Sequence, residues 1–244
     1  MRIMTLNMRY GSGAEKLGDP GYDLPTSPGK LQAIAAAIKS VEPDIVALQE
    51  VRNQLQAENL ARLAGLNSVY VSHPLGYRLL FFEWGLAFLY RVDLAETASR
   101  SVLIDRTSGV GRTGLICRVS FGVEMATFIN VHLDHDHKET QIENILRLLK
   151  QWPTPLCLLG DFNLAPDDSL LNPLQEFVAD SCLLADSSLS REAVAAGTLL
   201  NKVSRRDYIW VDRNKINVHE AGLLAEPYRM ISDHVGYWAD IDLK

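Results

Sequence analysis

Acidic and imidazole side chains stand at the ends of several apolar, strand-like runs in this sequence, where they could take part in catalysis. Glu50 ends one such run, Asp161 follows another and Asp207 opens a third. Charged groups are rarely buried without a partner, so we expect these strand ends to converge on one solvent-accessible edge that can hold a metal ion. The set comprises Glu50, His132, Asp161, Asn163, Asp207, Asp233 and His234.

The donor atoms of this set indicate which ion it would hold. It offers carboxylate and amide oxygens together with two imidazoles, and it contains no thiolate. Oxygen donors of this kind suit hard divalent cations, whereas zinc sites favour thiolate and imidazole. Magnesium or manganese therefore fits the set best.

Short strands and a few helices must position these groups. Apolar residues recur at helical spacing over Leu31 to Val41 and Ile142 to Trp152, and Gln54 to Ala64 is predicted to be a helix that stops at Gly65. Many short strands with about four helices favour two packed sheets with helices outside, in one domain over 1–244. The predicted strands cover 1–7, 44–48, 69–72, 85–90, 113–121, 124–132, 156–159, 208–211, 216–221 and 235–241.

The composition limits the class of protein. Of 244 residues, 47% are hydrophobic and 22% are charged, which is typical of a soluble globular chain and argues against disorder or a coiled coil. No apolar run approaches the ~20 residues of a membrane helix, and the N-terminus predicts a strand rather than a signal peptide. We therefore expect a cytoplasmic protein.

The three cysteines, Cys117, Cys157 and Cys182, are odd in number and widely spaced, which favours thiols in the core over disulfides or a zinc site.

Six short blocks of residues contain most of the groups named above. They are Thr5–Asn7, Asp44–Val51, Asn130–His135, Gly160–Asn163, Asp207–Ile209 and Ser232–His234. In order and spacing these blocks resemble the motifs of the endonuclease/exonuclease/phosphatase superfamily, which includes the deoxyribonuclease I-like enzymes. The resemblance implies a four-layer α/β sandwich of two packed mixed β-sheets flanked by helices, a divalent metal ion and hydrolysis of a phosphate ester.

The resemblance also implies roles around the metal and the attacking water. Glu50 would be the principal metal ligand, with Asn7 close by, and Asp233 would support the metal or its waters. Asp161 would orient or deprotonate the water. Asn163 would hold Asp161 and a phosphate oxygen.

The same resemblance assigns the phosphate contacts to two histidines. Asp207 would pair with His234, and His132 and His234 would contact the phosphate. In-line attack on an anionic ester builds charge on the phosphate oxygens, so a cation and fixed donors must meet it there. A histidine paired with a carboxylate stays protonated to higher pH, which suits such a donor.

Four further residues are candidates at the rim of the site, and three of them have a structural alternative. Glu83 lies between two aromatic residues and would orient His132, or it is an exposed rim glutamate. Arg112 would contact substrate, or it is an ordinary turn arginine. His135 would contact substrate, or it is solvated surface. Arg206 replaces the isoleucine usual in the family and adds a cation beside the predicted site.

The natural substrate stays open at this stage. AP endonucleases carry tyrosine where this chain has His132, which disfavours abasic-site repair. The net charge of −6 disfavours broad affinity for a phosphate backbone, although a metal ion and a local basic patch can outweigh it. The candidate platforms for a base, sugar ring or lipid are the aromatic residues Tyr22, Tyr77, Phe81, Phe82 and Trp84. Core packing is the simpler account of Phe81 and Phe82. We expect a monomeric phosphodiesterase or nuclease acting on nucleic acid, a nucleotide or a small phosphodiester. The alternatives are a small-molecule, inositol or lipid phosphomonoesterase, or a catalytically silent binding module.

Overall fold

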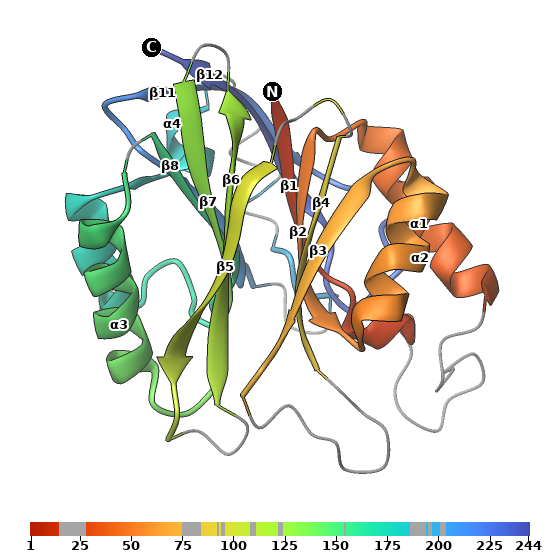
Figure 1. Cartoon of the computed structure of the whole chain (residues 1–244), viewed down its shortest axis with the longest axis horizontal. Coiled ribbons are helices and arrows are strands. Elements are labelled where there is room, and N and C mark those ends of the chain that lie inside the picture. Colours follow the sequence, from red (N-terminus) through yellow and green to blue (C-terminus); the bar gives the residue numbers. More distant parts are fainter. Residues whose placement is uncertain are drawn as a thin grey trace.

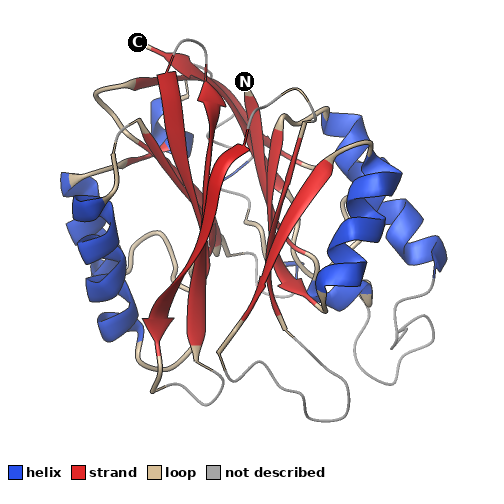
Figure 2. Ribbon diagram, in the orientation of Figure 1, coloured by secondary structure: helices blue, strands red, loops and turns tan. Residues whose placement is uncertain are grey.

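The computed structural model consists of two six-stranded β-sheets packed face to face, with helices against the outer face of each sheet (Figure 1, Figure 2). Both sheets are mixed, which confirms the predicted four-layer α/β sandwich. The structure describes the chain apart from residues 15–27, 75–83, 92, 94–95, 108–110, 122–123, 154, 186–193, 195–196 and 201–203.

The first sheet has the strand order β11-β12-β1-β2-β4-β3. Its outer face is covered by α1 (Pro28–Val41) and α2 (Gln54–Ala64), whose apolar sides pack with Met4 and Leu6 (Figure 1). A 3-10 helix, η1 (Arg9–Gly11), follows its first strand. The strands are β1 (Arg2–Asn7), β2 (Ile45–Val51), β3 (Asn67–Ser72), β4 (Gly85–Tyr90), β11 (Ile216–Leu223) and β12 (Tyr237–Leu243).

The second sheet has the order β5-β6-β7-β8-β10-β9. Its outer face packs against α3 (Lys138–Gln151) and the 3-10 helix η2 (Ser169–Glu176), and the short α4 (Ser181–Leu184) follows its edge strand. Every helix in the described part of the chain is too short or too polar to cross a membrane. The strands are β5 (Glu96–Asp105), β6 (Arg112–Phe121), β7 (Glu124–His132), β8 (Leu156–Asp161), β9 (Ala179–Asp180) and β10 (Asp207–Val211).

The hydrophobic core lies mainly between the two sheets, because alternate strand residues point to opposite faces. Phe88 of the first sheet and Phe128 and Ile209 of the second are fully buried in this central cluster. Each cysteine is free and buried, as predicted. The alternate residues of the same strands enter two outer clusters beneath the helices.

The middle of each sheet is a parallel pair of strands, and this arrangement positions the candidate site. β1 runs parallel to β2, and β7 runs parallel to β8. Parallel strands carry their carboxyl ends to the same edge, which is where open α/β sheets bind ligands. Asn7 stands beside Gln49 at one such edge, and His132 stands beside Asp161 at the other.

Most predicted elements are present, with two informative differences. The helix α2 has the predicted bounds, from Gln54 to Ala64, and Gly65 caps it in the left-handed conformation (φ 78°). Strand β5 was not predicted, because an edge strand with polar residues carries little apolar alternation. Strands β8 and β10 include Asp161 and Asp207, so these carboxylates belong to the ladder itself and not to flanking loops.

A buried polar network joins the two sheets directly beneath the carboxyl ends. Gln49 Nε2 donates to Asn130 Oδ1 (2.7 Å), which links β2 to β7. Asn130 Nδ2 donates in turn to the backbone oxygens of Leu48 and Ala87, each at 3.0 Å. Both amide side chains are fully buried, so each hydrogen bond matters more than it would at the surface. The network fixes how the strands that carry Glu50 and His132 face one another.

We expect Asn130→Ala to lower the free energy of unfolding by about 3 kcal/mol, because it leaves buried donor and acceptor groups without partners. Urea denaturation measures this change. The matched control is Asn217→Ala, which removes an asparagine from the surface of β11, where its amide bonds Asp242. Equal losses in the two variants would show that the network between the sheets has no special energetic role.

Candidate active site

Asp161 lies at the centre of the candidate site and contacts residues from both sheets. Its Oδ2 accepts a hydrogen bond from Asn7 Nδ2 (3.0 Å) and lies 3.6 Å from His132 Nε2 and 3.7 Å from His234 Nε2. Its Oδ1 accepts the backbone N–H of Asn163 (2.9 Å). The carboxylate is only 1% exposed. The predicted groups therefore meet in one place, but that place is a buried floor rather than the solvent-accessible edge we expected.

The backbone around Asp161 is shaped by two residues with positive φ. Gly160 has φ 144°, and a Cβ there would lie 1.9 Å from the backbone oxygen of Val131, so a side chain is excluded. Asn163 has φ 53°, which turns its backbone N–H toward Asp161. Asn163 Nδ2 also donates to the backbone oxygen of Leu133 (2.9 Å). The Gly160 to Asn163 block thus holds the Asp161 carboxylate in one orientation.

Glu50 is presented by an irregularity in β2. Its φ is 53°, and the pairing of β2 with β4 shifts register between Leu48 and Val51. Asn7 Nδ2 donates to Glu50 Oε1 (3.1 Å) as well as to Asp161, so one amide group bridges the two carboxylates. Burial raises the pKa of Glu50 to about 7, and the negative charges of Asp233 and Asp161 contribute to this shift.

The Asp207–His234 pair holds a positively charged imidazolium in the site. His234 Nδ1 lies 2.8 Å from Asp207 Oδ2, and both side chains are buried. Burial alone lowers the pKa of His234, but the carboxylates of Asp207 and Asp161 outweigh burial and raise that pKa to about 10. His234 is therefore an imidazolium at neutral pH, with Nδ1–H bonded to Asp207 and Nε2–H free to serve a ligand.

The ionisation of Asp161 is tied to this pair. Asp161 stands directly opposite Asp207 in the antiparallel ladder of β8 and β10. Burial raises the pKa of Asp161 to about 6, Asp207 adds to the shift, and His234 opposes it. A carboxyl group with a pKa just below neutrality is suited to accept a proton from water.

His132 differs from His234 in its protonation. Burial lowers the pKa of His132 well below its usual value, and the nearby Arg112 lowers it further. Unlike His234, which its carboxylate neighbours keep charged, His132 is therefore neutral. Its Nε2 lies 3.4 Å from Asn163 Nδ2, and its Nδ1 has no hydrogen-bond partner in the described residues.

A group of unpartnered nitrogens lies beside His132. The ring of Trp84 packs edge-on against His132 and His73, at centroid distances of 5.6 and 5.3 Å, and the guanidinium of Arg112 lies 4.5 Å from the Trp84 ring centroid. Arg112 Nη2 pairs with Asp134 (3.1 Å). Buried nitrogens of these four residues have no hydrogen-bond partner among the described residues: Trp84 Nε1, His73 Nε2, His132 Nδ1, and Arg112 Nε and Nη1.

These unmet donors need an acceptor from beyond the described residues. His73 Nδ1 accepts the backbone N–H of Thr113 (3.1 Å), and burial lowers the pKa of His73 to about 3, so its proton is on Nε2. A buried donor without a partner costs about 1–3 kcal/mol. Arg112 is thus a buried arginine and not a turn arginine. Sequence reasoning did not find His73, which carries no motif signal.

Two carboxylates of the site have no cation of their own among the described residues. Asp207 pairs with His234, Asp233 with Arg9 (Nε–Oδ2 3.3 Å) and Asp134 with Arg112. Glu50 and Asp161 share the neutral Asn7 amide, and the His234 imidazolium 3.7 Å from Asp161 is already paired with Asp207. A divalent cation would balance both charges, so the oxygen donors of these residues fit a hard metal ion.

A second grouping of possible ligands is less suitable for a cation. In the described residues, ligand atoms of Asp161, Asp207 and His234 lie within 4.8 Å of one another. Because His234 is protonated, it donates hydrogen bonds and repels a cation. We therefore place the fitting donors on the Glu50 side of Asp161.

The remaining candidates at the rim of the site differ in their exposure and in their contacts. Arg206 Nη1 donates to the backbone oxygen of Asn163 (3.3 Å), which puts this cation beside the site. His135 is exposed, and its backbone N–H donates to Asp134. Glu83 lies outside the described residues, and so do the aromatic residues Tyr22, Tyr77, Phe81 and Phe82.

We expect the metal-free protein to lose stability as the pH rises. The folded-state pKa values of Glu50 and Asp161, about 7 and 6, exceed the ordinary values of 4.5 and 3.8. These two groups therefore bind more protons in the folded state than in the unfolded state, and so does His234, whose folded-state pKa is about 10. Below about pH 6.5 the lowered pKa values of His73 and His132 oppose this effect, so the free energy of unfolding should fall as the pH rises above that value. Urea denaturation with a chelator from pH 6.5 to 8.5 measures the slope.

Glu50→Gln should make this slope shallower, because glutamine does not titrate. Glu124→Gln, at an exposed position of β7, is the control and should keep the slope of the unmodified protein. Added Mg²⁺ should raise the melting temperature at pH 7.5, and less so in Glu50→Gln. A Glu50→Gln variant that kept the full slope would contradict the raised pKa.

Several solved structures share this fold. The human Nocturnin catalytic domain with bound sulfate aligns with a TM-score of 0.79, at 18% identity, over 100% of this chain and 93% of that one. Mannosyl-6-phosphatase of Bacteroides thetaiotaomicron gives 0.77, at 18% identity and 99% coverage of both chains. D. rerio TDP2 complexed with single strand DNA product gives 0.75, at 17% identity, over 99% of this chain and 98% of that one. At these identities the likeness shows the fold.

Among curated proteins, a segment of this chain is similar to a DNA ligase of Chlamydia caviae. The two are 29% identical over 100 residues, which is 41% of this chain and 14% of the ligase. The match to a protein family is much longer and spans residues 4–234. Since that match includes all six motif blocks and the fold agrees with it, this chain belongs to the endonuclease/exonuclease/phosphatase family, whose members hydrolyse phosphoesters.

Proposed function

We propose that this protein is a Mg²⁺- or Mn²⁺-dependent phosphoesterase that hydrolyses a P–O ester bond by direct attack of water, with phosphodiesters favoured. The observation that carries the proposal is the set of contacts around Asp161. One buried carboxylate with a pKa of about 6 lies within 4 Å of a neutral imidazole, an imidazolium and an amide. These are the groups that activation of water and stabilisation of a phosphoryl transition state require.

Each residue of the set has a chemical task in this proposal. Asp161 orients the attacking water and accepts its proton. The Nε2–H of His234 donates to a phosphate oxygen, and Asp207 keeps that imidazole charged. Asn163 and neutral His132 bind other phosphate oxygens. No covalent intermediate forms, because water is the nucleophile.

Glu50, Asp161 and the amide oxygen of Asn7 would hold the metal ion, with Asp233 supporting its waters. When bound, the cation supplies positive charge that polarises the phosphate and favours ionised water. Asn7 would have to turn its amide to present oxygen, a rotation that leaves the backbone unchanged.

The donors around Trp84 support a substrate with acceptor groups beyond the scissile bond. Arg112, Trp84 and His73 together offer several N–H groups next to His132 that have no partner among the described residues. A phosphodiester extends on both sides of phosphorus and can reach them. TDP2, solved with single strand DNA product, supports a phosphodiester, whereas the mannosyl-6-phosphatase supports a phosphomonoester as the second candidate. We further propose that the enzyme acts as a monomer in the cytoplasm.

Asp161→Asn should reduce kcat at least about 100-fold on bis(p-nitrophenyl) phosphate with Mg²⁺, because the general base is lost. A chelator in excess should abolish the activity of the unmodified protein, and Mg²⁺ should restore it. Asp167→Asn, an exposed change six residues along the chain, should leave kcat unchanged. Full activity of Asp161→Asn, or activity that persists in the chelator, would refute the proposed mechanism.

Arg112→Met should raise KM about tenfold or more while kcat changes less, because a charged hydrogen bond to substrate is lost. Steady-state kinetics on the preferred ester separate the two constants. Arg100→Met, an exposed change on the neighbouring strand β5, is the control. An unchanged KM in a folded Arg112→Met variant would make this arginine a structural residue.

A further inference from the structure

Two cationic side chains converge on one backbone oxygen at the rim of the candidate active site. Lys138, the first residue of α3, donates from Nζ to the carbonyl oxygen of Asn163 (2.8 Å), and Arg206 donates to the same oxygen from Nη1 (3.3 Å). The two nitrogens therefore lie no more than about 6 Å apart. Like charges at this separation repel one another, so the rim carries concentrated positive charge although the chain has a net charge of −6.

Neither cation has a carboxylate partner among the described residues. In that part of the chain, the Asn163 carbonyl is the hydrogen-bond acceptor of both side chains, and no ion pair involves Lys138 or Arg206. A lysine ammonium has three N–H donors and an arginine guanidinium has five, so one shared carbonyl leaves most of them available. Both side chains are half-buried and within reach of a ligand. An anion placed between them would reduce the repulsion and use these donors.

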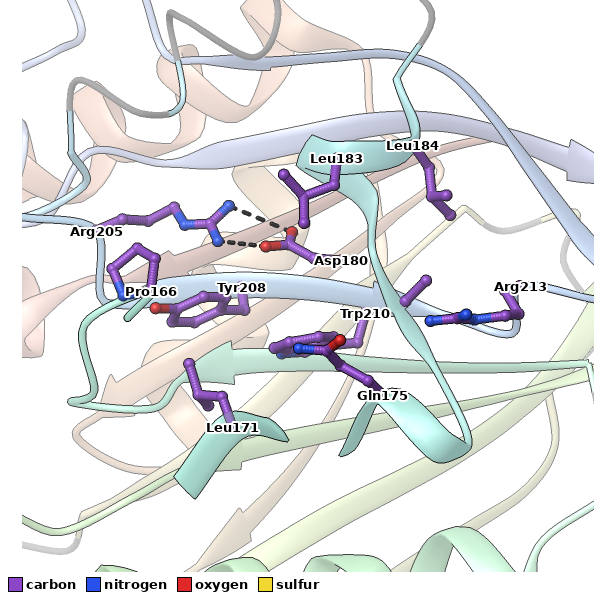
Figure 3. A pocket seen from close by; sticks show the side chains of 11 residues that line it. Pro166, Leu171, Gln175, Asp180, Leu183, Leu184, Arg205, Tyr208, Trp210 and Arg213 are labelled. Carbon is purple, nitrogen blue, oxygen red and sulfur yellow. Dashed lines mark hydrogen bonds and ion pairs between the residues drawn. The ribbon is translucent and has the colours of Figure 1, made fainter. Parts of the chain in front are cut away.

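The preceding arginine differs from Arg206 in both respects. Arg205 is buried, and its guanidinium donates from two nitrogens to both carboxylate oxygens of Asp180, as the two dashed lines in Figure 3 show. It also lies 4.4 Å from the centroid of the Tyr208 ring, in the wall of the pocket drawn in Figure 3. Of two consecutive arginines, one is thus neutralised inside the fold, and the other keeps its charge beside the active site.

The backbone of Arg206 is fixed on both sides. Its N–H donates to Oγ1 of the buried Thr198 (2.9 Å), and its carbonyl oxygen accepts the N–H of Phe162 (2.9 Å). Phe162 directly follows Asp161 in the chain, so these contacts set the position of Arg206 relative to the proposed general base. A cation held in this way loses less conformational freedom when it binds a ligand.

Asn163 relates the two cations to the scissile phosphate. Its Nδ2 lies 3.4 Å from His132 Nε2, its backbone N–H donates to Asp161, and in the proposed mechanism its side chain binds a phosphate oxygen. The carbonyl that gathers Lys138 and Arg206 belongs to the same residue. An anion bound by these cations would therefore be a close neighbour of the scissile phosphate.

We propose that Lys138 and Arg206 form a subsite for a second phosphate of the substrate, carried on the sugar that bears the scissile phosphate. This inference rests on the proposed function and names its substrate class: a nucleotide ester with two phosphates, within a nucleic acid strand or as a small molecule. A phosphate presents several acceptor oxygens, so the planar guanidinium can bind two of them while the ammonium binds another.

Steady-state kinetics with Mg²⁺ on two chromogenic esters test the subsite. Thymidine 5′-(p-nitrophenyl phosphate) has a single phosphate, and its 3′-phosphorylated form has a second one. The added phosphate should lower KM for p-nitrophenol release about tenfold, because it forms charged hydrogen bonds with both cations. Equal KM values for the two esters would overturn the inference and leave the proposed hydrolysis intact.

Binding measurements separate the subsite from the proposed function. If neither ester is hydrolysed, the proposed function fails, and isothermal titration calorimetry with Mg²⁺ then tests the subsite alone. Thymidine 3′,5′-bisphosphate should bind about tenfold more tightly than thymidine 5′-monophosphate. Equal affinity for these two nucleotides would overturn the inference.

Four variants locate the effect of the second phosphate. Lys138→Met and Arg206→Met should each reduce the tenfold KM ratio of the two esters to about threefold or less, and Lys138→Arg should keep most of it because the charge remains. The matched control is Lys150→Met, which removes an exposed lysine from the last turn of α3 and should keep the full ratio. A ratio that persists in both methionine variants, or that the control also loses, would contradict the subsite.

Competition experiments distinguish the two sources of the second phosphate. Thymidine 3′,5′-bisphosphate represents a small molecule, and pentathymidylate represents a nucleic acid strand. Tighter inhibition by the strand, weakening steeply as salt rises, would assign a nucleic acid substrate, and tighter inhibition by the bisphosphate would assign a small one. Both competitors should weaken in Lys138→Met, and inhibition that stays unchanged for both in this variant would overturn the subsite.

Discussion

The placement of two buried carboxylates opposite one another, Asp161 on β8 and Asp207 on β10, is the constraint on which the rest of the site depends. Like charges directly opposite in an antiparallel ladder repel, and burial strengthens that repulsion. The chain meets the problem by giving each carboxylate a different environment. Asp207 binds a histidine that stays protonated, and Asp161 keeps a raised pKa and an amide donor. One carboxylate is thereby held in an ion pair, and the other can exchange a proton.

The arrangement of the site residues requires backbone strain at two positions. Glu50 and Asn163 both have a φ of 53°, a conformation that non-glycine residues adopt at an energetic cost, and each presents a functional group to the same pocket. The Gln49–Asn130 network beneath them joins the sheets through hydrogen bonds that tolerate little sliding. Because the strands cannot shift relative to one another, the strained residues keep their positions. The rigid parallel pairs thus allow the site to be built from residues distant in sequence.

The fold and the clustering of the site residues could be predicted from the sequence because both follow from local sequence signals. The helix ending at Gly65 and the carboxylate after Gly160 are marked by residue types with strong backbone preferences. Strand β5 and His73 carry no such signal, since a polar edge strand has little periodicity and a lone histidine has no motif. The neutral state of His132 was also beyond reach, because it results from burial among Arg112, Trp84 and other groups that only the packed sheets bring together. Sequence patterns therefore do not predict the contacts between the two sheets or the protonation states that depend on those contacts.

The electrostatic balance of the site connects its stability to its chemistry. Asp207, Asp233 and Asp134 are each paired with a cation. Glu50 and Asp161, whose oxygens fit a divalent ion, share a neutral amide, and the His234 imidazolium near Asp161 is already paired with Asp207. Without an ion, these two groups favour protonation and lower the stability of the folded state at neutral pH. Replacing them by apolar residues would remove that cost and also the site. The excess negative charge is thus a stability cost that the proposed function explains, and it makes the metal-free site attractive to a cation and repulsive to an anionic ester, so metal binding should favour substrate binding.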